Sequence, residues 1–408
     1  PIHLKENVLS PIILVVGTRA EAIKLIPLYF ELKKEKLPAL LCATDQHLEM
    51  LKDVFSVFDV TPDFSFNIMK QNQDLFHVTT SVLKETKSLY QKIKPSLVIV
   101  HGDTTTTMSA ALSAFYLHIP IAHVEAGLRT GNMQSPFPEE MNRKIVGQIA
   151  NYHFSPTAFS TANLLAEGVP RENVFCTGNP VVDALHWVKE KIINKKIQID
   201  STLQNLVTEC KQKNKKMILL TAHRRESFNG GLLRIFNSVK QFAITHPDVF
   251  IFYPTHPNPN VQKAINESGI TSLKNIFTTK QILYKDLIYL LMNVNWVATD
   301  SGGIQEEAVS LGKKVIALRD FTERMEGVWE GSEVLVGTNE QKILNTLEQF
   351  YNEQTTKLSP STIYGDGKAC TRIVSILKER LNNDVELIDN KHFIFCNKNS
   401  IGKRKEAT

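Results

Sequence analysis

Short apolar runs alternate with helical patterns along most of the chain, and this alternation restricts the fold more than any other feature. The runs are continuously apolar, which is typical of parallel strands buried on both faces. The first half has such runs at residues 11–17, 39–44, 96–102 and 119–125. Helical patterns separate them at residues 21–36, 74–92 and 106–117. Similar runs return at residues 216–223, 249–256, 295–300 and 313–319, with a helical pattern at 231–246. The sequence therefore predicts an α/β protein with doubly wound parallel sheets.

The length of 408 residues exceeds that of one ordinary domain, so two α/β domains are expected. A hinge is predicted near residues 176–184, which places a first domain at 1–180 and a second at 181–366. A helical segment at 367–382 follows the second domain. The tail at 383–408 has no usable periodicity and a basic end, which favours partial disorder.

The composition is that of a globular protein, and it excludes several classes of partner. Hydrophobic residues make up 42% and charged residues 22% of the chain, unlike a disordered protein. The net charge of +5 is mild, and no element concentrates basic residues as nucleic-acid binding requires. The five cysteines lack the spacing of a metal site or a disulfide framework. The N-terminal apolar run is too short to span a bilayer, so we expect a cytoplasmic protein that binds neither membrane nor nucleic acid.

Carboxylates follow short apolar runs within residues 101–145. Asp103 lies in HGDTTTT, Glu125 in HVEAGLRT and Glu139 in PFPEEMNRKI. Because open α/β sheets bind ligands at the carboxyl ends of their strands, these side chains are expected to face a ligand. Such a group of carboxylates indicates acid–base chemistry on a neutral or anionic substrate.

A first candidate anion site follows the first predicted strand. In GTRAEAIKLIPL a glycine turn places Arg19 and Lys24 near the start of a helix, where free N–H groups favour an anion. An ordinary turn with surface charges explains the same pattern equally well.

A second candidate anion site is DSGGIQEEAVSLGK, in which Ser301, Gly302 and Gly303 precede a helix. Their backbone N–H groups and the helix dipole favour a phosphate. Glu307, one turn further on, is suited to accept hydrogen bonds from ribose hydroxyls. The alternative is a capped helix whose acidic residues complement its own N-terminus.

Further polar loops follow the later strands. His223 in TAHRRESFNGG precedes two arginines, a cluster suited to a phosphate or a leaving group. His256 lies in the proline-rich loop THPNPN, which is able to line a cleft. In RDFTERMEG, Arg319, Glu323 and Arg324 form either an ion-paired loop or a substrate contact, and the sequence leaves both open.

Taken in order, these segments resemble the bacterial UDP-N-acetylglucosamine 2-epimerases of the non-hydrolysing type. The resemblance extends from Gly17 to about Leu381 through GTRAEAIK, HGDTTTT, HVEAGLRT, PFPEEMNR, TAHRRES, TDSGGIQEE and RDFTER. It implies a glycosyltransferase-B fold, in which two Rossmann-like domains face across a cleft and the C-terminal helix returns to the first domain. It also implies a homodimer that reversibly converts UDP-GlcNAc into UDP-ManNAc for a bacterial surface polysaccharide, without any cofactor or metal.

The resemblance implies roles for individual residues. UDP is eliminated to give 2-acetamidoglucal and is then added back, so carboxylates must remove and return the C2 proton. The catalytic candidates are Asp103, Glu125, Glu139 and His223, and the three carboxylates share the proton-transfer assignment jointly. The substrate-binding candidates are Arg19, Lys24, Arg143, His256, Ser301, Gly302, Gly303, Glu307 and Arg324.

Many members of this family bind a second UDP-GlcNAc as an activator. The counterparts of that site here are QHLE and NIMKQNQ, which make Gln46, Glu49 and Asn72 the candidate activator residues. Asn72 replaces an arginine that is usual in the family, and an amide does not supply positive charge to a diphosphate. We therefore predict weakened or altered activation.

Other functions remain open on the sequence. A hydrolysing epimerase would release free ManNAc and UDP, but its pattern lacks the HVEAGLRT and PEExNR pair. A glycosyltransferase would share the fold. A UDP-sugar sensor without turnover would need the carboxylates to be replaced.

Overall fold

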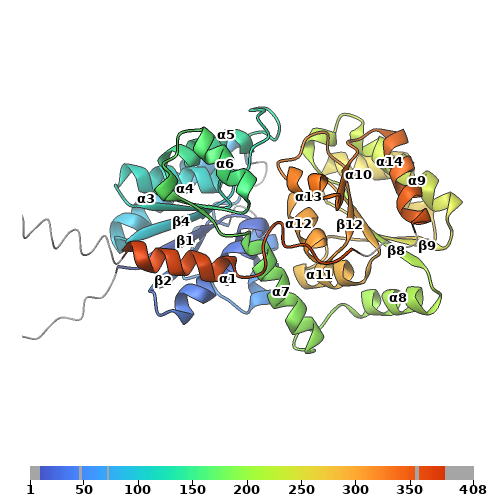
Figure 1. Ribbon diagram of the computed structural model, residues 1–408, viewed down its shortest axis with the longest axis horizontal. Coiled ribbons are helices and arrows are strands. Elements are labelled where there is room, and N and C mark those ends of the chain that lie inside the picture. The colour runs from blue at the N-terminus through green and yellow to red at the C-terminus, as the bar shows by residue number, and fades with distance from the viewer. Residues whose placement is uncertain (1–9, 46–47, 71–72, 354–357, 382–408) are drawn as a thin grey trace, which may run out of the picture.

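The computed structural model describes residues 10–45, 48–70, 73–353 and 358–381, and the predicted tail at 383–408 lies outside them (Figure 1). These residues form two parallel sheets, each with helices on both sides (Figure 1). The doubly wound α/β fold predicted from the alternation of apolar runs and helical patterns is confirmed.

The first sheet has the strand order β3-β2-β1-β4-β5-β6-β7, and every pair of neighbours is parallel. Its strands are β1 (Ile12–Val16), β2 (Ala39–Ala43), β3 (Phe64–Ser65), β4 (Leu97–His101), β5 (Ile121–Val124), β6 (Tyr152–Ser155) and β7 (Val174–Cys176). Its helices are α1 (Arg19–Lys34), α2 (Leu48–Phe58), α3 (Leu75–Ile93), α4 (Thr105–Tyr116), α5 (Glu139–Ile149) and α6 (Ala158–Ala166). The 3-10 helix η1 (Arg171–Asn173) precedes β7.

The second sheet has the order β10-β9-β8-β11-β12-β13 and is also parallel throughout. Its strands are β8 (Lys216–Thr221), β9 (Val249–Pro254), β10 (Ile276–Thr279), β11 (Trp296–Thr299), β12 (Lys314–Ala317) and β13 (Glu333–Leu335). Its helices are α9 (Gly231–Thr245), α10 (Pro259–Ser268), α11 (Tyr284–Asn293), α12 (Gly302–Ser310), α13 (Met325–Glu330) and α14 (Glu340–Asn352), with 3-10 turns η2 (Arg225–Ser227) and η3 (Ile270–Ser272).

Successive residues of the central strands bury opposite faces of each sheet. In β1, for example, Leu14 packs into one hydrophobic cluster and Val15 into another. This explains why the strands are continuously apolar in sequence. The cluster that contains Leu14 also contains Leu219 of β8, so one continuous core joins the facing sides of the two sheets.

The hinge region is more ordered than its sequence indicates. No helix was predicted from the hinge to Asn214, but this part of the chain contains α7 (Pro180–Ile193) and α8 (Ser201–Gln212). Asn179 caps α7 and Pro180 is its first residue, a combination that favours a helix start. α7 packs on α1 of the first sheet and on α11 and α12 of the second.

The chain returns to the first sheet at its described end. Residues 369–381 are helical and are coloured red beside the first sheet in Figure 1. Ile373 and Leu377 are buried in the core cluster that includes α1, and Lys378 pairs with Glu35 at 2.7 Å. The domain limits themselves stay predictions, since α7 contacts both sheets.

Candidate active site

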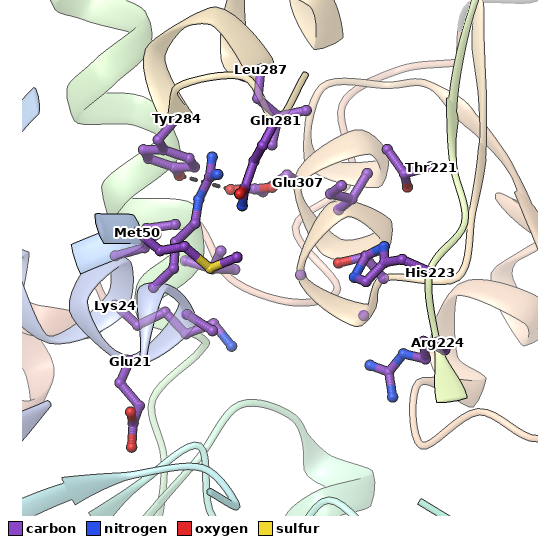
Figure 2. Close-up of a pocket in the computed structure, with 18 of the residues that line it drawn as sticks. Glu21, Lys24, Met50, Thr221, His223, Arg224, Gln281, Tyr284, Leu287 and Glu307 are labelled. Atoms are coloured by element: carbon purple, nitrogen blue, oxygen red, sulfur yellow. Dashed lines mark hydrogen bonds between the residues drawn. The ribbon is translucent and has the colours of Figure 1, made fainter. Parts of the chain in front are cut away.

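A cavity of about 360 Å³ opens between the sheets, at the carboxyl ends of their strands. Figure 2 shows Lys24 on one side of this space and His223 and Arg224 on the other, with Tyr284 bonded to Glu307 at one edge. Most residues singled out in the sequence share this lining: Arg19, Lys24, Asp103, Glu125, His223, His256, Ser301, Gly302, Gly303, Glu307 and Arg324. Glu139 and Arg143 do not belong to the lining.

Glu125 lies at the cavity among cations that favour its ionised form. It follows β5 in a left-handed conformation with φ of 61°, which a non-glycine residue keeps only where its surroundings hold it. Lys24 pairs with its carboxylate, Asn179 donates a hydrogen bond to Oε2 at 2.7 Å, and Arg324 Nη2 lies 3.8 Å from Oε1. Burial alone would raise the pKa of Glu125, but Lys24, His101 and Arg324 outweigh it and hold that pKa well below its usual range.

Asp103 and Glu139 are two further carboxyl groups, and they have other partners than Glu125. Arg143 Nη2 donates to Asp103 Oδ2 at 2.6 Å, and the Asp103 side chain is 25% exposed. Glu139 begins α5, and its buried Oε2 has no hydrogen-bond partner among the described residues. Burial, and then the neighbouring charge of Asp103, raise the pKa of Glu139. A carboxyl group whose pKa is raised in this way holds a proton more readily than an ordinary carboxyl group, which suits it to proton transfer.

His223 stands on the opposite wall, in the loop after β8. Its ring stacks on that of His256 with centroids 5.0 Å apart and planes within 6°. Asp300, at the end of β11, accepts hydrogen bonds through Oδ2 from the backbone N–H groups of His223 and Arg224, at 2.5 and 2.7 Å. The second domain thus presents a histidine whose backbone is fixed by a buried carboxylate.

The N-terminus of α12 faces the cavity. Ser301 is the residue that precedes the helix, and its side chain makes no capping bond within the described chain. The helix also has no acidic residue in its first turn, so the alternative of a helix that complements its own dipole does not apply. An added Cβ at Gly302 would lie 2.3 Å from Arg324 Nη1, whereas at Gly303 it would meet none of the described heavy atoms within 4 Å. Such a helix start offers N–H donors to a phosphate.

Glu307 lines the cavity beside Tyr284. Its Oε1 accepts a hydrogen bond from Tyr284 at 2.7 Å (Figure 2), and burial raises its pKa to about 7. Arg19, at the start of α1, donates to the carbonyl oxygen of Ile282 at 3.1 Å and lies 3.8 Å from Asp53 Oδ2. Arg19 therefore connects the first domain to the loop before α11.

The loop after β12 is ion-paired, which is one of the two interpretations that the sequence left open. Arg319 is buried and contacts Glu226 and Glu323, each at 2.9 Å. Glu323 also lies 3.4 Å from Arg143 and pairs with Arg324. Because Lys24, Arg143 and Arg324 all pair with carboxylates of the protein, their predicted contacts with a substrate stay predictions.

Sequence reasoning missed several residues of this network. Asn179 donates from one amide group to Glu125 and to Glu306 Oε2, at 2.7 and 2.6 Å, and so links carboxylates of the two domains. Burial raises the pKa of Glu306, which also pairs with Arg324. The sequence signal at Asn179 is an asparagine before a proline, which is typical of a helix start. Asp300 ends the apolar run at residues 295–300.

The candidate activator residues are only partly covered. Gln46 and Asn72 lie outside the described residues, and Glu49 lies in α2. Over the described ranges, no group of three histidine, cysteine or acidic side chains is placed to hold a metal ion. None of the described helices has both the length and the apolar character needed to cross a membrane.

Comparison with known proteins identifies the family. The family model described as UDP-N-acetylglucosamine 2-epimerase matches residues 31–378. The chain belongs to the UDP-N-acetylglucosamine 2-epimerase family. A relative from Campylobacter jejuni with that name is 45% identical over 378 residues, which cover 91% of this chain and 98% of the relative. The predicted family is therefore confirmed, and the chain is an enzyme of the epimerase class for which the non-hydrolysing bacterial type fits.

Solved structures of epimerases have the same fold. The Neisseria meningitidis UDP-GlcNAc 2-epimerase bound to UDP-GlcNAc is 41% identical, with a TM-score of 0.83 over 90% of this chain and 100% of that one. The Methanocaldococcus jannaschii enzyme in complex with UDP-GlcNAc and UDP is 32% identical, with a TM-score of 0.79 over 90% and 99%. The predicted glycosyltransferase-B fold is confirmed by these neighbours.

Proposed function

We propose that this epimerase interconverts UDP-GlcNAc and UDP-ManNAc without hydrolysis, by elimination and re-addition of UDP. The observation that carries the proposal is that the carboxylates at the ends of β4 and β5 face the uncapped N-terminus of α12 across one cavity. Such a cavity provides proton-transfer groups on one wall and donors for a diphosphate on the other. The UDP-GlcNAc complexes of the related enzymes support the choice of substrate.

The pKa shifts support a division of labour among the carboxyl groups. Glu125 keeps its charge because cations surround it, so it is suited to stabilise positive charge that develops at the anomeric carbon. Asp103, which lines the cavity, and Glu139, which lies outside the lining but senses the charge of Asp103, are then the proposed pair that removes and returns the C2 proton. As the base takes that proton, the C2–H electrons form the C1–C2 double bond and the C1–O bond breaks, so UDP departs with its electron pair. Addition of UDP to C1 and protonation of C2 from the opposite face complete the reaction.

The nucleotide is proposed to lie against the second domain. The N–H groups at Gly302 and Gly303 receive the diphosphate, and Arg19 adds positive charge from the first domain. Glu307 accepts from the ribose hydroxyls. His223 and His256 line the same cavity, and we assign His223 to proton transfer at the departing diphosphate.

NMR of the reaction in deuterated water tests the proposal. The enzyme, given UDP-GlcNAc alone, is expected to produce UDP-ManNAc and to place deuterium at C2 of both sugars, because the removed proton exchanges with solvent. Accumulation of free ManNAc with UDP would instead identify a hydrolysing epimerase. Binding without any product would favour a sensor, and turnover only with an added acceptor would favour a glycosyltransferase.

The variant Glu139→Gln separates the two carboxyl roles. Because Gln cannot carry the proton, we expect turnover and C2 deuterium incorporation to fall together by roughly 10² to 10⁴-fold. Glu353→Gln, which changes a glutamate paired with Lys314 away from the cavity, is the matched control. Full activity of Glu139→Gln would exclude this residue from proton transfer.

The assembly and location are part of the same proposal. A homodimer is supported by Phe115 and Tyr116, aromatic side chains at the end of α4 that are 49% and 67% exposed. A reducing cytoplasm is supported by the free thiols of Cys42, Cys176, Cys210 and Cys370. The product would serve a bacterial surface polysaccharide. Light scattering of the purified chain gives the oligomeric state directly.

A further inference from the structure

We propose that Asp300 is a positioning residue that sets both the orientation of His223 and the ring nitrogen that carries its proton. The proposal rests on the proposed function, in which His223 takes part in proton transfer at this cavity. It gives Asp300 a role in that function. In the sequence, Asp300 is only the last residue of the apolar run at 295–300.

The contacts of Asp300 are divided between its two oxygen atoms. The residue is fully buried at the end of β11. Oδ2 accepts both backbone N–H groups of the loop after β8, from His223 at 2.5 Å and from Arg224 at 2.7 Å. Oδ1 is left without a hydrogen bond to any described residue, and it lies 3.5 Å from His223 Nδ1. One oxygen thus holds the loop, and the other faces the imidazole.

A buried carboxylate oxygen without a donor is costly, so its place beside a ring nitrogen calls for an explanation. A proton on Nδ1 of His223 provides the donor. The other ring nitrogen, Nε2, then keeps its lone pair for the cavity, where the His223 side chain is 38% exposed. A carboxylate behind a histidine commonly fixes its tautomer in this way.

The stacking of His223 on His256 does not achieve this by itself. The two rings are nearly parallel, with centroids 5.0 Å apart, which restrains the plane of the His223 ring but does not distinguish one ring nitrogen from the other. Asp300 is the described carboxylate that makes this distinction, because its Oδ1 approaches the ring at Nδ1. Stacking thus restrains the ring plane, and the carboxylate selects the nitrogen that carries the proton.

The variant Asp300→Asn separates positioning from loop support. Both backbone N–H groups donate to the same oxygen, so the amide oxygen must take the place of Oδ2 and the NH₂ group that of Oδ1. The loop keeps its acceptor, but a donor now faces Nδ1. His223 must then move its proton to Nε2, which reverses the role of that nitrogen in the cavity.

Kinetics provide the first measurement. For Asp300→Asn we expect kcat to fall by roughly 10²-fold, with KM for UDP-GlcNAc within about two-fold of the unmodified enzyme. A merely structural role would instead lower the melting temperature and raise KM. Asp286→Asn is the matched control, because Asp286 is a buried aspartate that accepts a backbone N–H from Asp200 at 2.9 Å and does not line the cavity. We expect this control to keep the kcat of the unmodified enzyme.

Nitrogen-15 NMR of the histidine rings in the ligand-free protein gives a second measurement that does not depend on turnover. The His223 signals, identified by their loss in His223→Gln, are expected to show the Nδ1–H tautomer in the unmodified chain and the Nε2–H tautomer in Asp300→Asn. An Nε2–H tautomer in the unmodified chain overturns the proposal, even if the variant does not fold. Unchanged kcat in Asp300→Asn overturns it as well. Failure of the proposed function appears separately, as absence of C2 deuterium with the unmodified enzyme.

Discussion

Glu333 is expected to make the stability of this protein fall as the pH rises. The residue begins β13, is 2% exposed, and lies beside Tyr364, whose hydroxyl is 3.1 Å from its Oε1. Its Oε2 has no hydrogen bond to any described residue. Burial raises the pKa of Glu333 to about 8, against the hydrogen bond from Tyr364, which lowers it. The native state therefore holds a proton on this carboxyl group at neutral pH.

The size of the effect follows from the two pKa values. The ordinary pKa is 4.5, so between that value and about 8 the native state binds a proton that the unfolded state has lost. The stabilisation is fully present below the lower value and is lost as the pH rises through the native pKa. At 1.36 kcal/mol per pH unit the loss is about 4 kcal/mol between pH 5 and pH 9. About 1.4 kcal/mol of this is lost between pH 7 and pH 9.

Glu333→Gln removes the titrating group and keeps the side-chain shape, so this pH dependence should disappear. Urea unfolding, followed by circular dichroism and by the fluorescence of buried Trp296, gives the unfolding free energy of each protein. The variant is expected to gain about 4 kcal/mol relative to the unmodified chain as the pH is raised from 5 to 9. Glu340→Gln changes an exposed glutamate of the same domain and is the control. A difference between Glu333→Gln and the unmodified chain that is constant with pH would refute the reasoning.

Two further perturbations test the cavity. Gly302→Ala forces a Cβ to within 2.3 Å of Arg324 Nη1, so we expect a loss of about 1–3 kcal/mol in unfolding free energy and a raised KM. Gly303→Ala is the control, and it should keep the stability because its Cβ meets no described atom within 4 Å. Equal melting temperatures of the two alanine variants would contradict this. Lys24→Met leaves Glu125 buried without its nearest cation and should cost about 3 kcal/mol, most of which Lys24→Met/Glu125→Gln recovers. Additive losses in a double-mutant cycle would show that the pair is not coupled.

Much of the fold is predictable from local patterns. The bounds predicted for the helices in the first sheet agree with α1, α3 and α4 to within a few residues, because the residue pattern that distinguishes a helix from the neighbouring apolar strands is local. β6 was missed because its four residues include His153 and Ser155, which break the apolar run. α7 and α8 were missed because lysines at the end of α7 and in the segments that follow each helix make the whole region read as weakly patterned.

Part of the site is also predictable from local sequence patterns. Asp103 and Glu125 were found because a carboxylate directly after an apolar run lies at the carboxyl end of a strand, whatever the rest of the chain does. The helix start at Ser301 was recognised from its glycines. These signals depend only on neighbours in the sequence.

The sequence by itself determined the two sheets, the polar residues at the ends of their strands and the family. Only the tertiary structure decided how those residues are charged. Lys24 pairs with Glu125, which is 101 residues away in the sequence, and Asn179 donates a hydrogen bond to Glu306, which is 127 residues away. No local sequence pattern predicts such contacts. Burial and the nearest charges fix protonation, and both depend on which segments pack together. For this reason Glu125 is held ionised while Glu139, which looks equivalent in the sequence, has its pKa raised.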